Sequence, residues 1–186
     1  MSRRWWPAVL LVAAFTLTAC IGQVSRSDFD KEVARRGNGM TDALVDQAFA
    51  AFAKQFPGGR VAQLSVGKGS MSAAVPLPGS TVDLDGYRFD FGATSWRRTA
   101  PVRVSGTDDI TAELFDPLAV SGLRHLRSLV ETTVERSSLS GAVPTSAYVD
   151  DAATAERHIR VTVDSDRGSY SAQFTLEGVF VDGDRH

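Results

Sequence analysis

The groups in this chain that could do chemistry are one thiol, three imidazoles and several paired carboxylates. Cys20 is the only cysteine, so the chain can form no internal disulfide. It comes directly after Leu17, Thr18 and Ala19, which end a stretch of 15 residues without a charge. A lone thiol that follows an apolar segment near the N-terminus indicates covalent modification of the sulfur.

The first 22 residues resemble the signal sequence of bacterial lipoproteins. Arg3 and Arg4 form the positive start, residues 5–19 form the apolar run, and Leu17-Thr18-Ala19-Cys20 matches all four positions of the lipobox. The run is shorter than the roughly 20 residues of a membrane-spanning helix. The resemblance implies that Cys20 is acylated and becomes the first residue after cleavage. Its acyl chains would then anchor the protein to the cell membrane, facing outside the cytoplasm.

The histidines and aspartates show no spacing typical of a metal or catalytic site. His125, His158 and His186 lie too far apart for the i, i+4 pair that places two imidazoles on one helix face. Three pairs of aspartates lie beside glycines, where turn formation explains them better than calcium binding. These pairs are Asp83 and Asp85, Asp164 and Asp166, and Asp182 and Asp184. We therefore predict no metal, no cofactor and no enzyme activity.

Trp96, Arg97 and Arg98 are the candidate contact residues. They fall in a stretch expected to be a loop between the two halves of the domain, and tryptophan and arginine are enriched at protein interfaces. Two interpretations stay open. Either the three residues bind a partner, or Trp96 fills the space between the halves while the arginines are solvated.

The predicted organisation is a signal peptide over residues 1–19, a lipidated N-terminus over 20–39 and one α+β domain over 40–186. The segment 20–39 serves either as a tether or as a short helix packed on the domain. The domain begins with a helix over 42–56, whose apolar residues form one stripe. Strands are expected over 60–66, 71–75, 81–84, 87–91 and 101–104. Asp85-Gly86 is expected to form a hairpin turn.

The pattern then repeats. A second helix should start at Asp116-Pro117, a capping aspartate followed by a proline that fits the first helical turn. Strands are expected over 145–149, 158–163 and 169–177. We predict two α-β-β-β repeats, over about 40–104 and 107–182, which share an antiparallel sheet with the helices packed on one face.

This order of elements resembles tandem repeats of the PepSY and β-lactamase-inhibitor-protein type, and Tyr87 and Phe91 in the first half match the spacing of Tyr170 and Phe174 in the second. The resemblance implies binding of other proteins.

Without Arg3 and Arg4, the 20 basic residues become 18 against 22 acidic residues, and a net charge near −4 disfavours nucleic acid as a partner.

We expect a non-catalytic lipoprotein that binds another cell-envelope protein. The alternative is a carrier that holds a lipid or small apolar ligand in a cavity between sheet and helices. The cavity would be lined by the leucines of the second helix and by six phenylalanines. These are Phe49, Phe52, Phe56, Phe89, Phe91 and Phe174.

Overall fold

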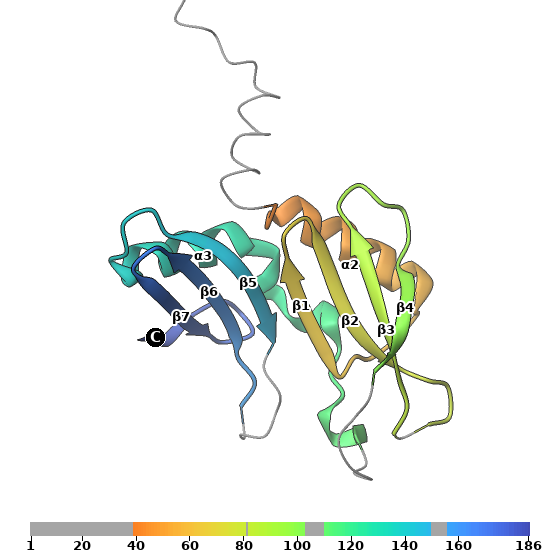
Figure 1. The fold of residues 1–186 in the computed structure, drawn as a ribbon. Helices are drawn as coiled ribbons and strands as arrows, with labels where there is room; N and C mark the ends of the chain where they lie inside the picture. Colours follow the sequence, from red (N-terminus) through yellow and green to blue (C-terminus); the bar gives the residue numbers. More distant parts are fainter. Residues whose placement is uncertain (1–38, 81, 103–109, 150–155) are drawn as a thin grey trace, which may run out of the picture.

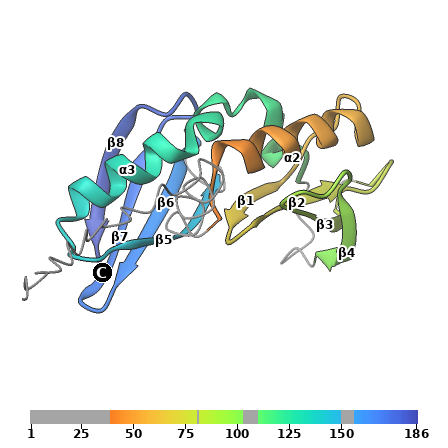
Figure 2. The same cartoon turned by 90° about the horizontal axis from the view of Figure 1, so that it is seen from above.

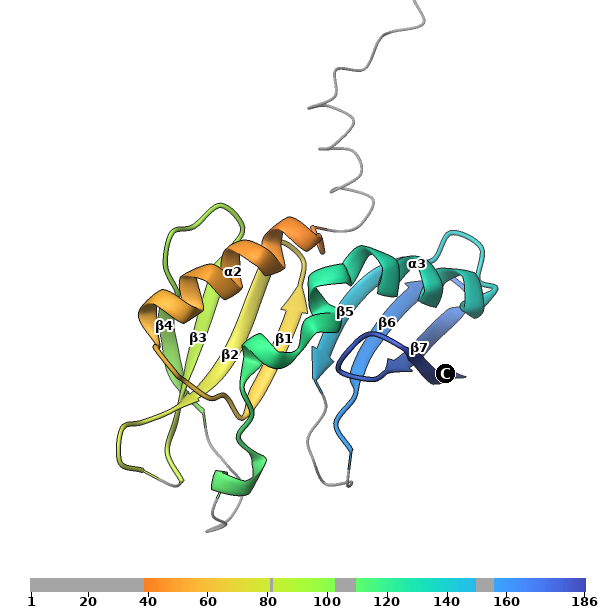
Figure 3. The same ribbon diagram turned by 180° about the vertical axis from the view of Figure 1, so that it is seen from behind.

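The protein has two layers, a sheet and a row of helices on one of its faces (Figures 1 and 2). The structure is a computed structural model that describes residues 39–80, 82–102, 110–149 and 156–186. The predicted signal peptide, Cys20 and the segment up to residue 38 lie outside the described residues. Figure 1 looks onto the face of the sheet that the helices leave open, and Figure 3 looks onto the helices.

Eight antiparallel strands form one sheet in the order β4-β3-β2-β1-β5-β6-β7-β8. The helix α2 precedes the first four strands and α3 precedes the last four, while β1 and β5 lie side by side in the middle. The strands are β1 (Gln63–Gly67), β2 (Ser70–Pro76), β3 (Leu84–Asp90), β4 (Arg97–Val102), β5 (Val143–Val149), β6 (Ile159–Ser165), β7 (Gly168–Phe174) and β8 (Phe180–Arg185). The predicted α+β class, with helices packed on an antiparallel sheet, is confirmed.

The helix α2 (Asp42–Gln55) lies where the apolar stripe predicts it. Thr41 caps it, because its Oγ1 accepts a hydrogen bond from the N–H of Leu44 at 3.2 Å. The stripe is buried against the sheet, with Phe49 and Phe52 at its centre. Pro57 and Gly58 follow the helix and prevent its continuation.

The helix α3 (Leu126–Ser137) begins later than the sequence predicts, after the 3₁₀ turns η2 (Pro117–Ala119) and η3 (Ser121–His125). Asp116 does cap a turn, since its Oδ1 accepts the N–H of Leu118 at 2.8 Å, but that turn is η2. Gly122 explains the interruption, because its N–H donates to the carbonyl of Leu176 at 2.7 Å. Because this N–H bonds the β7–β8 connection, it cannot also donate to the carbonyl four residues earlier, as a continuous α-helix requires.

The expected turn at Asp85-Gly86 is wrong, because both residues lie inside β3. The connection between β2 and β3 is formed earlier, where the N–H of Leu77 donates to the carbonyl of Asp83 at 3.0 Å. A side chain on Gly86 would come within 2.7 Å of Thr99 Oγ1 on β4, so the glycine permits a close approach of two strands. The β3–β4 register shifts at this point, which identifies a bulge.

Each half has four strands, whereas the sequence indicates three or so. The additional strand of the second half is β8, whose Asp182, Gly183 and Asp184 give it no apolar alternation. It is an edge strand, and its pairing with β7 defines it. In the first half the edge strand β4 begins at Arg97, four residues before the expected 101.

The two halves meet along a short seam. The pairing of β1 with β5 covers three residue pairs, and the central pair is Ser65 with Tyr148. On the helix side, Oδ1 of Asp42 in α2 accepts the N–H of Arg127 at 2.8 Å and thereby caps α3. The guanidinium of Arg124 lies 5.0 Å from the centre of the Phe49 ring and bonds Asp46 at 3.0 Å.

Gly122→Ala tests the contact between η3 and the β7–β8 connection. The new Cβ would come within 2.6 Å of the backbone nitrogen of Gly178, which cannot move aside as a flexible side chain does. We expect a loss of about 2 kcal/mol in the free energy of unfolding by urea. The control is Gly67→Ala, where a Cβ meets nothing within 4 Å and should leave stability unchanged or slightly higher. Equal losses in the two variants would contradict the explanation of the late helix start.

Asp42→Ala tests the cap that α2 supplies to α3. We expect a loss of about 1 kcal/mol, because α3 has no other side-chain cap at its N-terminus. Asp46→Ala is the control, since it removes only an exposed ion pair with Arg124 and should cost less than about 0.5 kcal/mol. Both are measured by urea unfolding of residues 20–186 carrying Cys20→Ser, and a larger loss for Asp46→Ala would refute the capping role.

Candidate binding surface

The predicted contact residues lie at one edge of the sheet, and the structure separates their roles. Trp96 comes immediately before β4, while Arg97 and Arg98 are its first two residues. All three were expected in a loop between the halves; they lie instead in and beside the outermost strand of the first half. The predicted lipidation site, Cys20, is outside the described residues.

Trp96 belongs to the core and is only 4% exposed. Its Nε1–H donates to the carbonyl of Ala48 in α2 at 2.9 Å, and its ring centre lies 5.7 Å from that of Phe52. The side chain of Gln55 bonds both the N–H and the carbonyl of Trp96 at 3.0 Å. Of the two roles that the sequence leaves open, the structure shows packing, and it corrects the position: the indole fills the layer between α2 and β3, not the space between the halves.

Arg98 forms a bidentate ion pair with Asp85, with two hydrogen bonds of 2.6 Å. The side chain of Asp85 is 5% exposed and that of Arg98 is 57% exposed, so the arginine reaches from solvent to a buried carboxylate. The hydrogen bond to Asp85 raises the pKa of the Arg98 guanidinium above its usual value. Arg98 therefore stabilises the edge of the fold.

Arg97 remains exposed and lies on the open face beside Arg88. Asp90 joins the two arginines, since its carboxylate oxygens lie 2.6 Å from Nε of Arg88 and 3.7 Å from Nη2 of Arg97. The hydrogen bond from Arg88 lowers the pKa of Asp90, so the carboxylate stays charged in mildly acidic conditions.

A polar row crosses the whole open face of the sheet, with one residue from each strand. The pairing register places them in line from β4 to β8. They are Arg97, Arg88, Ser72, Ser65, Tyr148, Arg160, Gln173 and Asp182. None is aliphatic, and Tyr148 is the one aromatic side chain, placed on the central seam.

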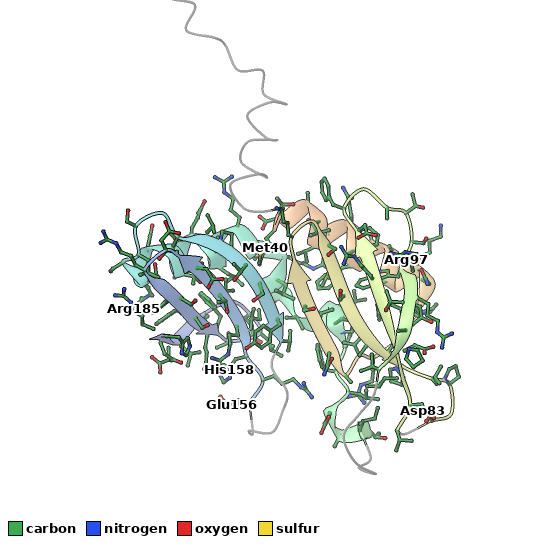
Figure 4. All side chains as sticks on the ribbon, viewed as in Figure 1. Met40, Asp83, Arg97, Glu156, His158 and Arg185 are labelled. Carbon is green, nitrogen blue, oxygen red and sulfur yellow. The ribbon has the colours of Figure 1, made fainter. Side chains whose placement is uncertain are left out.

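A second row lies beside the first in the second half of the sheet. Ser146, Thr162, Ser171 and Asp184 are paired in register across β5 to β8. The hydroxyl groups of Thr162 and Ser171 are 3.1 Å apart and hydrogen bonded. We call the two rows together the open polar face; Figure 4 shows side chains in the same view as Figure 1.

The open polar face has opposite charges at its two sides. Arg88 and Arg97 lie on β3 and β4, while Asp182 and Asp184 lie on β8. Among the described residues, Ile110 of η1 (Ile110–Glu113) covers the far end of the first half, where it packs on Ala62, Ala74 and Leu84. The two rows themselves present hydroxyl, amide and charged groups, although Ser171 is only 6% exposed.

Within the described ranges, no group of three or more His, Cys, Asp or Glu side chains is placed to hold a metal ion. The three histidines lie apart in the structure as well: His125 precedes α3, His158 precedes β6, and His186 ends the chain. Across the same part of the chain, none of the helices has the length and apolar content needed to cross a membrane.

No protein-family model matches this chain, and no curated protein matches its sequence. Among solved structures, a protein from Clostridium difficile 630 described as a putative lipoprotein superposes with a TM-score of 0.53 and 8% identity, over 73% of this chain and 88% of that one. At this identity the likeness shows the fold alone. A DUF2874 family protein from Bacteroides uniformis ATCC 8492 aligns at 16% identity over 77% of this chain and 87% of that one, but its TM-score of 0.24 is too low to support an argument.

Arg98→Ala tests the structural role assigned to Arg98. We expect a clear fall in the urea midpoint, because the variant leaves the buried carboxylate of Asp85 without its cation. Arg97→Ala is the matched control on the same strand and should leave the midpoint unchanged, since both side chains of its ion pair with Asp90 are exposed. If the two variants unfold at the same urea concentration, the ion pair with Asp85 does not stabilise the edge.

Proposed function

We propose that this protein is a lipoprotein, anchored through Cys20 outside the cytoplasm, that binds another cell-envelope protein with its open polar face. The observation that carries the proposal is the polar row that spans all eight strands. The sequence match to the lipobox supports the anchor, and the fold shared with the C. difficile protein is compatible with it. Catalysis is not part of the proposal.

The two faces of the sheet differ in what they contact, and this difference supports the proposal. Leu64, Val66, Ala147 and Val149 point to the helix layer and are buried. Their neighbours along β1 and β5, Ser65 among them, point the other way and are not needed for the core. A face that the fold leaves free of packing is available for recognition.

The second support is the size of the face. Eight strands spaced by about 4.8 Å give a surface about 34 Å wide. A stable complex covers about 800 Å² on each partner, which corresponds to a patch of similar width. Tyr148 lies in its middle, where buried aromatic anchors contribute most to binding.

The third support is the charge pattern, which defines the chemistry of the partner. Arg88 and Arg97 outnumber Asp90 at β3–β4 and favour acidic groups opposite them, and the aspartates of β8 favour basic groups. The partner surface should therefore carry the reverse polarity and hydroxyl or amide groups in between.

The packing under α2 favours binding over the carriage of a ligand. Four of the six phenylalanines proposed to line a cavity are only 1% exposed. They are Phe49, Phe52, Phe89 and Phe174. The rings of Phe52 and Phe89 both pack on Trp96, with centres 5.7 and 5.8 Å apart. Phe91, also among the six, is exposed.

Site-specific photocrosslinking in the producing bacterium tests the proposal. A photoreactive phenylalanine replaces Tyr148 on the open polar face, and the matched control replaces Glu135, which is exposed on α3. We expect a discrete protein adduct from position 148 and none from position 135. Arg160→Glu, next to Tyr148 in the row, should weaken that adduct at least tenfold, whereas Lys54→Glu on α2 should not. Equal adducts from both positions, or none from position 148, would refute binding through this face.

A further inference from the structure

We infer that Phe91 and Lys68 form a second contact surface, which rests on the lipid bilayer next to the anchor. They lie at the tips of two adjacent loops, beside the point where the N-terminal segment joins the domain. The inference uses the acylated Cys20 of the proposed function and does not depend on the open polar face.

The described chain begins against the β1–β2 hairpin. Gly67 and Ser70 are the last pair of that hairpin, so Lys68 and Gly69 form its tip, and Lys68 is exposed. A side chain on Gly39 would come within 2.7 Å of the backbone nitrogen of Gly69. The backbone at Gly39, where the described chain begins, therefore packs directly on this tip.

Phe91 lies beside the same tip, since its N–H donates to the carbonyl of Gly69 at 2.8 Å. Phe91 and Gly92 are the central residues of a turn closed by a 2.9 Å hydrogen bond from the N–H of Ala93 to the carbonyl of Asp90. The φ of Gly92 is 82°, which suits such a turn. Phe91 as a residue is 53% exposed.

The fold does not require a phenylalanine at position 91. The alternation of Tyr87 and Phe89 predicts a third ring in the core, but β3 ends at Asp90 and the turn carries Phe91 out into solvent. Turn positions otherwise take small or polar residues, as Gly92 and Thr94 do here. A ring held at a loop tip by backbone hydrogen bonds has the form of an interfacial contact.

The location of the anchor identifies the bilayer as the occupant. Eighteen residues separate Cys20 from Gly39, and even a fully extended chain of that length spans no more than about 65 Å. The tether thus keeps the domain near the membrane, where weak contacts suffice because their effective concentration is high. A phenylalanine partitions into the headgroup region and a lysine attracts anionic headgroups.

The opposite end of the sheet provides a matched comparison. Val82 is 41% exposed and lies in the β2–β3 connection, and Figure 4 shows its neighbour Asp83 at the far end of the sheet from Met40. The seven residues of β3 separate the two ends by about 23 Å. When Phe91 touches the bilayer, Val82 therefore remains in water.

The test uses the lipidated full chain in vesicles of phosphatidylethanolamine and phosphatidylglycerol. Because acylation blocks Cys20, a thiol introduced by Val82→Cys, or by Thr94→Cys in the exposed loop beside an intact Phe91, is the only one that reacts with a fluorescent maleimide. Lipids carrying a nitroxide just below the headgroup then quench any fluorophore at the membrane surface. We expect at least twofold stronger quenching at position 94 than at position 82, and Lys68→Glu or Phe91→Ser should reduce the difference.

Equal quenching at the two positions, with the protein still floating with the vesicles, would overturn the contact and leave the anchor intact. The unmodified chain distinguishes the other failure. If it reacts with the maleimide, Cys20 is not acylated, and both the lipid anchor and the contact of Phe91 with the bilayer are refuted. In that case the photocrosslinking result at position 148 still stands as a separate test of protein binding.

Discussion

The structure depends on the seam between β1 and β5, where three residue pairs join two four-stranded halves into one sheet. The helix layer also joins the two halves. Asp42 belongs to α2 but caps α3, so the start of each helix lies at the seam. One side chain therefore lies in the first turn of α2 and bonds the backbone at the start of α3. Because this junction joins the halves into one sheet, it determines the width of the sheet, the single polar row that crosses it and the central position of Tyr148.

The residues that the sequence places correctly are those whose local pattern and tertiary environment agree. The stripe of α2, its cap at Thr41 and the Pro57-Gly58 stop all act within one turn, so the predicted 42–56 differs from the observed helix by one residue. Interior strands with clear alternation, such as β6, were also predictable. The late start of α3 was not, because it depends on the contact of Gly122 with a loop more than fifty residues later. No local propensity carries that information.

The errors at the edges of the sheet have a common cause. Asp85-Gly86 has the sequence of a turn, yet a buried ion pair with Arg98 and a close approach by Thr99 place it inside a strand. Edge strand β8 carries aspartates where an interior strand would carry valines, so its pattern is that of a loop. Trp96 shows the same problem for the candidate site. A tryptophan followed by two arginines is typical of an interface. Its contacts with Ala48 and Phe52, which are distant in the sequence, show that the indole is packed in the core.

The two outer strands of the sheet carry different charged residues, which bears on edge-to-edge contact between copies of this protein. An open sheet has two edges with unpaired backbone groups, and here one edge is basic and the other acidic. Joining β8 of one molecule to β8 of another would set aspartate against aspartate. Joining β8 to β4 would match the charges and, because the two edges differ, could continue without end into a filament. Pro101 in β4 has no N–H to donate to a ladder. A proline in this outermost strand thus disfavours the extension of the sheet from one molecule to the next.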